Sequence, residues 1–455
     1  MSTHDLTQGS VGRTLMKFTV PFLLANLLQT FYSIVDLIVV GQFADAAAIS
    51  SVSVGGIVVA TLTSFIIGLT TGGTVLIGQF CGSKQEKNVQ ESVQTLFTLT
   101  PLIAIALSVI FMFLVDPLLK LLNTPPEAYE GARHYMQICI IGLVFTSGYN
   151  AISAALRAMG DSKNPLLFVL IACVFNILGD LVLVAGFNMG AEGAAIATML
   201  GQALSMILGI VFLKRKNFIF DFKPSSFGIK KEKAAQLLKL GIPISLQEVL
   251  VMSSFVVIEG FINNLGYIAT AAAGVADKLF TVAVIPSSSF SASIAAMAAQ
   301  NMGAGRQDRM RKCLVIGSAW SFAVGVVLFL LVWFAPQVPL ALFTQDKAVV
   351  ASASNYLISY KYEYLLCSVA FCMHGFINGS GHTKFTLWNN IISTFVVRLP
   401  LVWLFSRAAG ATLMHIGIAF PIASAVQLIG AAVYIASGRW RRGTISENAI
   451  GVIES

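Results

Sequence analysis

The stretch Gly78–Gln85, GQFCGSKQ, is repeated 221 positions later as Ala299–Arg306, AQNMGAGR. A second stretch is repeated with the same offset, because ALRAMGDSKNP at Ala155–Pro165 has a twin, FINGSGHTKF, at Phe376–Phe385. Both members of each pair occupy the same place within a series of apolar segments. The chain therefore consists of two related halves.

The composition indicates a membrane protein. Hydrophobic residues make up 56% of the 455 positions and charged residues only 11%, and the mean hydropathy is +0.81. A soluble globular domain carries about 25% charged residues. The length suits about a dozen spans of ~20 residues joined by short loops, which leaves no room for a soluble catalytic domain. The six cysteines contain no CxxC motif and are interpreted as apolar filling, with only Cys81 in a loop.

The apolar runs predict an all-α membrane protein with twelve transmembrane helices, six in each half. The first run is interpreted as a span and not as a cleavable signal, because similar runs follow it. Breaks are predicted at Asn123–Pro126, Gly186–Gly190 and Asn263–Gly266. The predicted helices are 15–41, 48–80, 94–116, 132–157, 165–185, 191–213, 236–262, 268–300, 313–335, 350–378, 385–406 and 411–437.

Six is an even number of spans, so both halves start on the same side of the membrane and the internal repeat is parallel. Two similar lobes that rock around a central cavity are a common build for a transporter. The predicted domains are an N-terminal lobe, a basic linker, a C-terminal lobe and a tail, at 1–213, 214–235, 236–438 and 439–455.

The distribution of lysine and arginine predicts the orientation. Most of the 29 basic residues fall on the side of the N-terminus, and the opposite loops hold only Lys120, Arg133, Lys347 and Arg407. Such an excess places both termini in the cytoplasm of a multi-pass cell-membrane protein. The net charge of +8 is then a topology signal and not evidence for nucleic-acid binding. The linker is interpreted as a solvated tether that touches anionic lipid.

Ionisable residues within spans are costly and usually functional. Asp36, Asn176, Asp180 and Thr198 form the most coherent set, because all four lie within roughly 7–12 Å of the outer boundary at ~1.5 Å per residue. Asn176 and Asp180 share one helix face. Hard oxygen ligands suit Na⁺, and two close carboxylates also suit H⁺. The residues alone leave open whether this set binds a cation or only locks the bundle.

Pro21 lies about 22 Å before Asp36 on the same predicted helix and favours a bend there. The bend is either static or moves the first span when the acidic site changes occupancy. Its counterpart, Pro243, lies one residue out of phase with the repeat offset.

The second half does not repeat the acidic set, since Asn176 and Asp180 map to Val397 and Leu401. Glu248 and Glu259 are its candidates for contact with a cation or substrate. His374 is interpreted as a packing residue. Five further charged residues in spans are left open between internal ion pairs and substrate contact: Asp277, Lys278, Lys361, Glu363 and Arg398.

The sequence resembles the multidrug and toxic compound extrusion (MATE) family over approximately residues 10–440. The motifs that carry the resemblance are Pro21 followed by Asp36, AQNMGAGR with its weaker twin GQFCGSKQ, and ALRAMGDSKNP with its twin FINGSGHTKF. The resemblance implies two six-helix lobes arranged as a V around a central cavity. It also implies export of organic cations or similar compounds, driven by Na⁺ or H⁺ moving inward.

Asp36, Asn176, Asp180 and Thr198 match the first-lobe cation site of the branch that includes bacterial DNA-damage-inducible and archaeal members. Another branch uses acidic residues in the seventh and tenth spans. This sequence departs from that pattern, because its tenth span has Cys367 and Cys372 where an acid is expected. Glu248 and Glu259 do not fall clearly on the seventh-span position.

The expected function is therefore secondary antiport of amphipathic, often cationic, drugs or metabolites in exchange for Na⁺ or H⁺. The alternative is a lipid or lipid-linked sugar flippase, for which Lys278, Lys361 and Arg398 are the only basic candidates. No HExxH, GxSxG or DxxD pattern in a span indicates an enzyme, and no repeated selectivity filter indicates a channel. The expected partners are a small-molecule substrate and the lipid bilayer, with no cofactor, no metal beyond Na⁺, and a monomeric protein.

Overall fold

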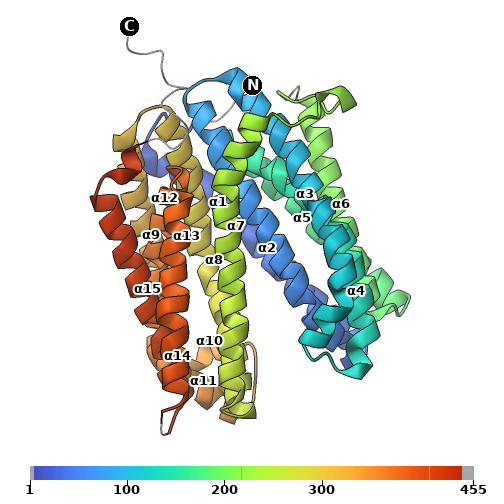
Figure 1. Ribbon diagram of the computed structural model, residues 1–455. Helices are drawn as coiled ribbons and strands as arrows, with labels where there is room; N and C mark the ends of the chain where they lie inside the picture. The colour runs from blue at the N-terminus through green and yellow to red at the C-terminus, as the bar shows by residue number, and fades with distance from the viewer. Residues whose placement is uncertain (1–4, 217, 409, 443–455) are drawn as a thin grey trace. The chain divides into compact units, whose positions relative to one another are not determined.

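The computed structural model describes residues 5–216, 218–408 and 410–442, and its regular elements in these ranges are helical. Eleven of the described helices are long and apolar enough to cross a membrane. Figure 1 shows them as long rods. The helices of the first half are α1 Val11–Phe43, α2 Ala46–Gly82, α3 Glu86–Leu121, α4 Pro126–Ala158, α5 Lys163–Asp180 with the π-helical η1 Leu181–Gly186, and α6 Gly190–Arg215.

The second half follows the same order after a short 3₁₀ turn, η2 Pro224–Ser226. Its first three long helices are α7 Lys231–Asn263, α8 Tyr267–Gly303 and α9 Gln307–Phe334. The remaining elements are α10 Gln337–Leu340, α11 Lys347–Tyr360, α12 Tyr362–Gly379, α13 Thr383–Ile391, the π-helical η3 Ile392–Arg398, α14 Leu399–Ser406, α15 Leu413–Ala436 and the 3₁₀ turn η4 Arg439–Arg441.

The predicted helix breaks are confirmed. α3 ends at Leu121 and α4 begins at Pro126, where a proline in the first turn has no backbone N–H to leave unpaired. The prediction of one continuous helix at 350–378 is wrong in detail, because α11 and α12 are interrupted at Lys361. Cys81, predicted in a loop, lies instead in the last turn of α2.

The backbone repeats the sequence duplication. Gly160 and Gly381 are 221 positions apart and have φ angles of +85° and +92°, a conformation that glycine adopts without strain. Lys84 and Gly305 are related by the same offset and have φ angles of +57° and +69°. The two motif pairs therefore form the same turns at the helix ends, and one of the four turns uses a lysine where its twin uses glycine.

The chain divides into two compact units. The first contains Val20–Ser245, and the second contains Leu6–Thr19 with the described residues from Leu246 onward. These units differ from the predicted lobes, because the first turns of α1 belong to the second unit and the first turns of α7 belong to the first. Pro21 and Pro243 lie beside these two crossing points. Residues 443–455 of the predicted tail lie outside the described residues.

The linker between the halves is an integral part of the first unit and not a solvated tether. Phe218 and Phe220 are buried. Lys233 is only 3% exposed, and its ammonium lies 4.4 Å from the centroid of the Phe80 ring. The basic residues of the linker suggested a solvated segment, although its aromatic side chains are packed.

Small residues bring the helices of the first unit close together. A Cβ atom on Gly72 would lie 2.5 Å from the backbone of Gly241, so α2 and the start of α7 touch through backbone. A Cβ atom on Gly179 would lie 3.0 Å from that of Ala197, so α5 and α6 also approach closely. This second contact brings the polar side chains of α5 and α6 within reach of each other.

Candidate cation site

Three helices of the first unit contribute the polar side chains predicted to form a site. α1 carries Asp36, α5 carries Asn176 and ends at Asp180, and α6 carries Thr198. Apolar residues of the same helices, including Val39 and Ala194, pack in one buried cluster with Tyr135 of α4. The site is thus built on packed helices and not on loops.

The polar side chains contact one another in a chain. The Thr198 hydroxyl donates to Asp36 Oδ2 over 3.2 Å, and Asn176 Nδ2 donates to Thr198 Oγ1 over 3.4 Å. The carboxyl groups of Asp36 and Asp180 lie within interaction range of each other. Asp180 is fully buried and Asn176 is 3% exposed, whereas Asp36 and Thr198 are half-buried. These contacts place the side chains of Asp36, Asn176 and Thr198 at one level of the helices.

The site has more acceptor oxygens than donors. Within the described part of the chain, Asp36 Oδ1, both oxygens of Asp180 and Asn176 Oδ1 are buried without a hydrogen-bond donor. Buried polar atoms nearly always have a partner, and a buried carboxylate without one is strongly disfavoured. A bound cation would coordinate several of these oxygens. A proton on one carboxyl group would instead supply a hydrogen-bond donor. The residues present therefore fit Na⁺ or H⁺.

The backbone changes directly after Asp180. The α-helical hydrogen-bond pattern of α5 ends there, and Leu181–Gly186 continue as a π-helix. π-Helical turns inside α-helices are uncommon and occur frequently at functional sites. The second half also has a π-helix in its fifth span, and this one ends at Arg398. The fifth span of each half thus places a buried charged residue at the edge of a π-helix, with opposite sign in the two halves.

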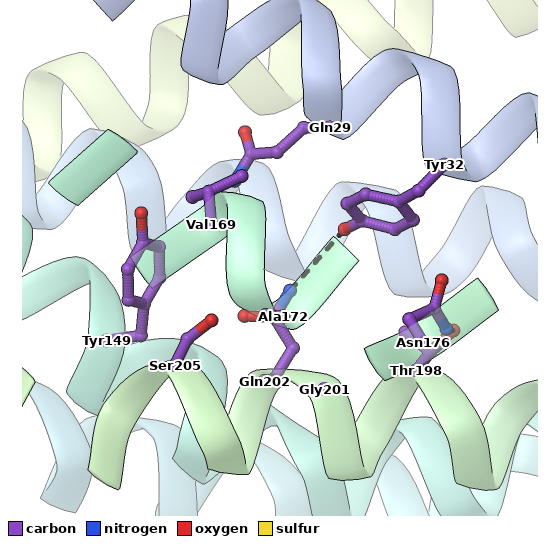
Figure 2. A pocket seen from close by; sticks show the side chains of 10 residues that line it. All are labelled: Gln29, Tyr32, Tyr149, Val169, Ala172, Asn176, Thr198, Gly201, Gln202 and Ser205. Atoms are coloured by element: carbon purple, nitrogen blue, oxygen red, sulfur yellow. Dashed lines mark hydrogen bonds between the residues drawn. The ribbon is translucent and has the colours of Figure 1, made fainter. Parts of the chain in front are cut away.

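A cavity adjoins the polar chain (Figure 2). It is lined by ten residues, including Asn176 and Thr198, and its enclosed space is about 10 Å³. Gln202 Nε2 donates to the Tyr32 hydroxyl over 3.5 Å across it. A space of about 10 Å³ is roughly what one water molecule or a small ion needs, and it is far smaller than the pocket of a drug-sized ligand.

Tyr32 and Gln202 were not predicted as site residues from the sequence. The signal that could have found them is spacing, because Tyr32 lies four residues before Asp36 and Gln202 four residues after Thr198. Residues four apart share a helix face. They therefore form a second polar rung between α1 and α6, one turn from the first.

The structure does not bring the second-half candidates together. Glu248 and Glu259 both lie on α7, eleven residues or roughly 16 Å apart along the helix. Glu259 is exposed and within electrostatic range of Asp277, whereas Glu248 is half-buried. The two acids of α7 therefore do not form one site.

Internal ion pairs were one of two alternatives that the sequence left open for Asp277, Lys278, Lys361 and Glu363, and the described residues do not form them. Among the described residues, neither Asp277 with Lys278 nor Lys361 with Glu363 forms an ion pair within 4.0 Å. The Lys361 ammonium lies 3.7 Å from the centroid of the Trp333 ring.

The side chains of Glu363 and Arg398 have other surroundings. Glu363 is 3% exposed and accepts a 2.7 Å hydrogen bond from Ser424. Arg398 is 8% exposed and packs over the rings of Phe255 and Phe420 at 5.8 and 5.2 Å. His374 is buried and lies 3.0 Å from the Asn389 side-chain amide, as expected for a packing residue.

Comparisons with known proteins identify the family. The MatE family model matches residues 21–182 and again residues 243–404, so the duplication is also a duplication of the family's domain. The probable multidrug resistance protein YpnP of Bacillus subtilis is 30% identical over 442 residues, which cover 97% of this chain and 98% of that protein. The multidrug export protein MepA of Staphylococcus saprophyticus is 22% identical over 89% of each chain.

Solved structures have the same fold. An outward-facing multidrug resistance MATE family transporter of the MOP superfamily superposes with a TM-score of 0.88, covering 97% of this chain and 98% of that one at 18% identity. The prediction of an all-α membrane protein with two repeated halves is confirmed. This chain belongs to the multidrug and toxic compound extrusion (MATE) family of transporters.

Proposed function

We propose that this protein is a secondary antiporter that exports amphipathic, often cationic, small molecules in exchange for Na⁺ or H⁺. The observation that carries the proposal is the group of buried acceptor oxygens without donors on Asp36, Asn176 and Asp180. Two acids in the hydrocarbon region are a costly way to join helices, and such residues usually mark ion pathways. The family membership supports the same activity and does not favour the flippase alternative.

In the proposed cycle, a cation from outside binds between Asp36 and Asp180 and neutralises one of the two negative charges that the carboxyl groups can carry. Asn176 and Thr198 orient the Asp36 carboxylate through their chain of hydrogen bonds and contribute further oxygens. Substrate and cation weaken each other's binding, and linkage requires this effect to be reciprocal. Entry of the cation then releases the substrate to the outside.

Pro21 provides a place where α1 can bend when the cation binds. It removes one backbone hydrogen bond of the helix and lies next to the point where α1 passes from the second unit into the first. The same helix carries Asp36, so a change of charge there acts on the segment that joins the units. Glu248 and Glu259 remain candidates for substrate contact in the second half.

The proposed orientation places both termini in the cytoplasm of the cell membrane, from the excess of Lys and Arg on that side. The branch with a first-lobe cation site is proposed from the match of Asp36, Asn176, Asp180 and Thr198. We further propose a monomer without a cofactor.

The test is efflux of a fluorescent cationic dye from proteoliposomes under an imposed Na⁺ gradient and, separately, a H⁺ gradient. The expected result is efflux under one of the two gradients and its loss in Asp36→Asn, which keeps the shape of the side chain and removes its charge. Efflux by Asp36→Asn at the wild-type rate would remove the site from the mechanism. Absence of efflux by the wild type under both gradients would contradict the antiporter proposal for this substrate class.

A further inference from the structure

The linker between the halves forms a strap with a fixed conformation, defined here as residues 218–230. Its aromatic side chains gather around Phe97 of α3, whose ring centroid lies 6.5, 5.4 and 5.6 Å from those of Phe218, Phe220 and Phe222. Phe227 adds a fourth contact, 5.1 Å from Phe220. The strap is therefore docked on the first unit by a cluster of aromatic rings.

Two backbone hydrogen bonds fix the depth of the strap. The Gly228 amide donates to Thr98 Oγ1 over 3.1 Å, and the Lys230 amide donates to Thr95 Oγ1 over 3.3 Å. These threonines lie where the apolar part of α3 begins, about 13 Å (Thr95) and about 18 Å (Thr98) along the helix from its first residue, Glu86. The strap thus lies at the level where α3 enters the hydrocarbon, which is the membrane–water interface.

The strap presents apolar side chains at this level. Phe227 and Ile229 flank the anchored Gly228, and each is 43% exposed. Exposed apolar side chains held at the interface match the acyl boundary of a bilayer, as in interfacial segments that bind membranes.

Basic side chains surround these apolar residues. The acids of the region already have partners, because Asp221 pairs with Lys223 at 3.2 Å and Glu232 with Lys233 at 3.6 Å. Five exposed basic residues at the ends of α6, the strap and α7 make no ion pair with any residue that the structure describes: Lys214, Arg215, Lys216, Lys230 and Lys231.

We propose that the strap and these five basic residues form a binding site for anionic phospholipid headgroups. The ammonium and guanidinium groups contact the headgroup phosphate, and Phe227 and Ile229 contact the start of the acyl chains. In a basic segment next to a membrane, each Lys or Arg raises the affinity for anionic lipid about fivefold. The site goes beyond the antiport activity, and only the choice of the cytoplasmic leaflet rests on the orientation proposed above.

The test titrates the purified protein in neutral detergent with dioleoylphosphatidylglycerol and, separately, dioleoylphosphatidylcholine. Native mass spectrometry counts the bound lipids and gives their affinity. The test variant is Lys230→Gln with Lys231→Gln, and the matched control is Lys120→Gln with Lys347→Gln. The control removes two exposed lysines at helix ends on the opposite side, Lys120 in the last turn of α3 and Lys347 at the start of α11. A Lys230→Arg, Lys231→Arg variant keeps the charge.

The wild type is expected to prefer phosphatidylglycerol, and the test variant to bind it about 20- to 30-fold more weakly, from two lysines at about fivefold each. The control and the arginine variant should keep the wild-type affinity. Equal weakening in test and control variants would mean a general charge effect and would overturn the proposal. Displacement of the lipid by an equal concentration of inorganic phosphate would also overturn it, because the site would then recognise a free anion.

Discussion

Thr198→Val is the substitution that tests the candidate cation site most directly. Valine has nearly the shape of threonine but lacks the hydroxyl that donates to Asp36 Oδ2 over 3.2 Å and accepts from Asn176 Nδ2 over 3.4 Å. A hydrogen bond to a charged group contributes about 1.5–3 kcal/mol net. Both bonds are long for their type, so the lower value applies. About 1.5 kcal/mol corresponds to roughly tenfold in affinity.

The assay is dye efflux from proteoliposomes as a function of Na⁺ concentration or external pH. Thr198→Val should shift the half-maximal cation concentration about tenfold, with the maximal rate changed less than about threefold. If the ion is Na⁺, the lost ligand oxygen weakens binding and the half-maximal concentration rises. If the ion is H⁺, the carboxylate loses a donor that favours its ionised form, and the half-maximal proton concentration falls.

The control is Thr61→Val on α2, where the hydroxyl bonds only to the carbonyl of Ile57 in its own helix, over 2.8 Å. This variant should keep the wild-type cation dependence. An unchanged cation dependence in Thr198→Val, or an equal shift in both variants, would refute the argument that the polar chain holds the cation site.

Two further predictions concern stability. Gly72→Ala should destabilise the protein by about 1–3 kcal/mol, because its Cβ would lie 2.5 Å from the Gly241 backbone. Gly56→Ala in the same helix meets nothing within 4 Å and should keep or raise the melting temperature, so equal melting temperatures for the two variants would contradict the close crossing. Burial lowers the pKa of His382 in the loop before α13, so the unfolded chain binds the proton more readily and stability should fall as pH drops below about 6.5. His382→Gln should flatten this fall in melting temperature between pH 7 and 5, and an unchanged slope would exclude His382 as its source.

The helices and their order could be predicted because both depend on local properties of the chain. Apolar length decides which segments span a bilayer, and the breaks at Pro126, Gly190 and Gly266 follow from residues that end or begin helices. The exception was the tenth span, which is interrupted at Lys361. A lysine that packs on the Trp333 ring is a tertiary contact, and periodicity does not indicate it.

The candidate site was predicted in part. Asp36, Asn176, Asp180 and Thr198 could be selected because charged and polar residues are rare within apolar runs and their depth follows from helix length. Tyr32 and Gln202 lie well inside α1 and α6, and they were missed because an uncharged tyrosine or glutamine within a span is a weaker signal than a charged residue. Only the packing of α1 against α6 places their side chains 3.5 Å apart.

The sequence by itself determined that this protein is a duplicated bundle of membrane helices with an acidic set in its first half, since hydropathy, repeat offset and residue type are properties of the chain alone. The tertiary structure decided which polar atoms meet. It also decided that aromatic rings dock the basic linker on the first unit. Finally, it decided that the first turns of α1 and of α7 belong to the opposite unit from the rest of each helix. These features depend on contacts between residues far apart in the chain, where close packing and not local propensity selects the partner.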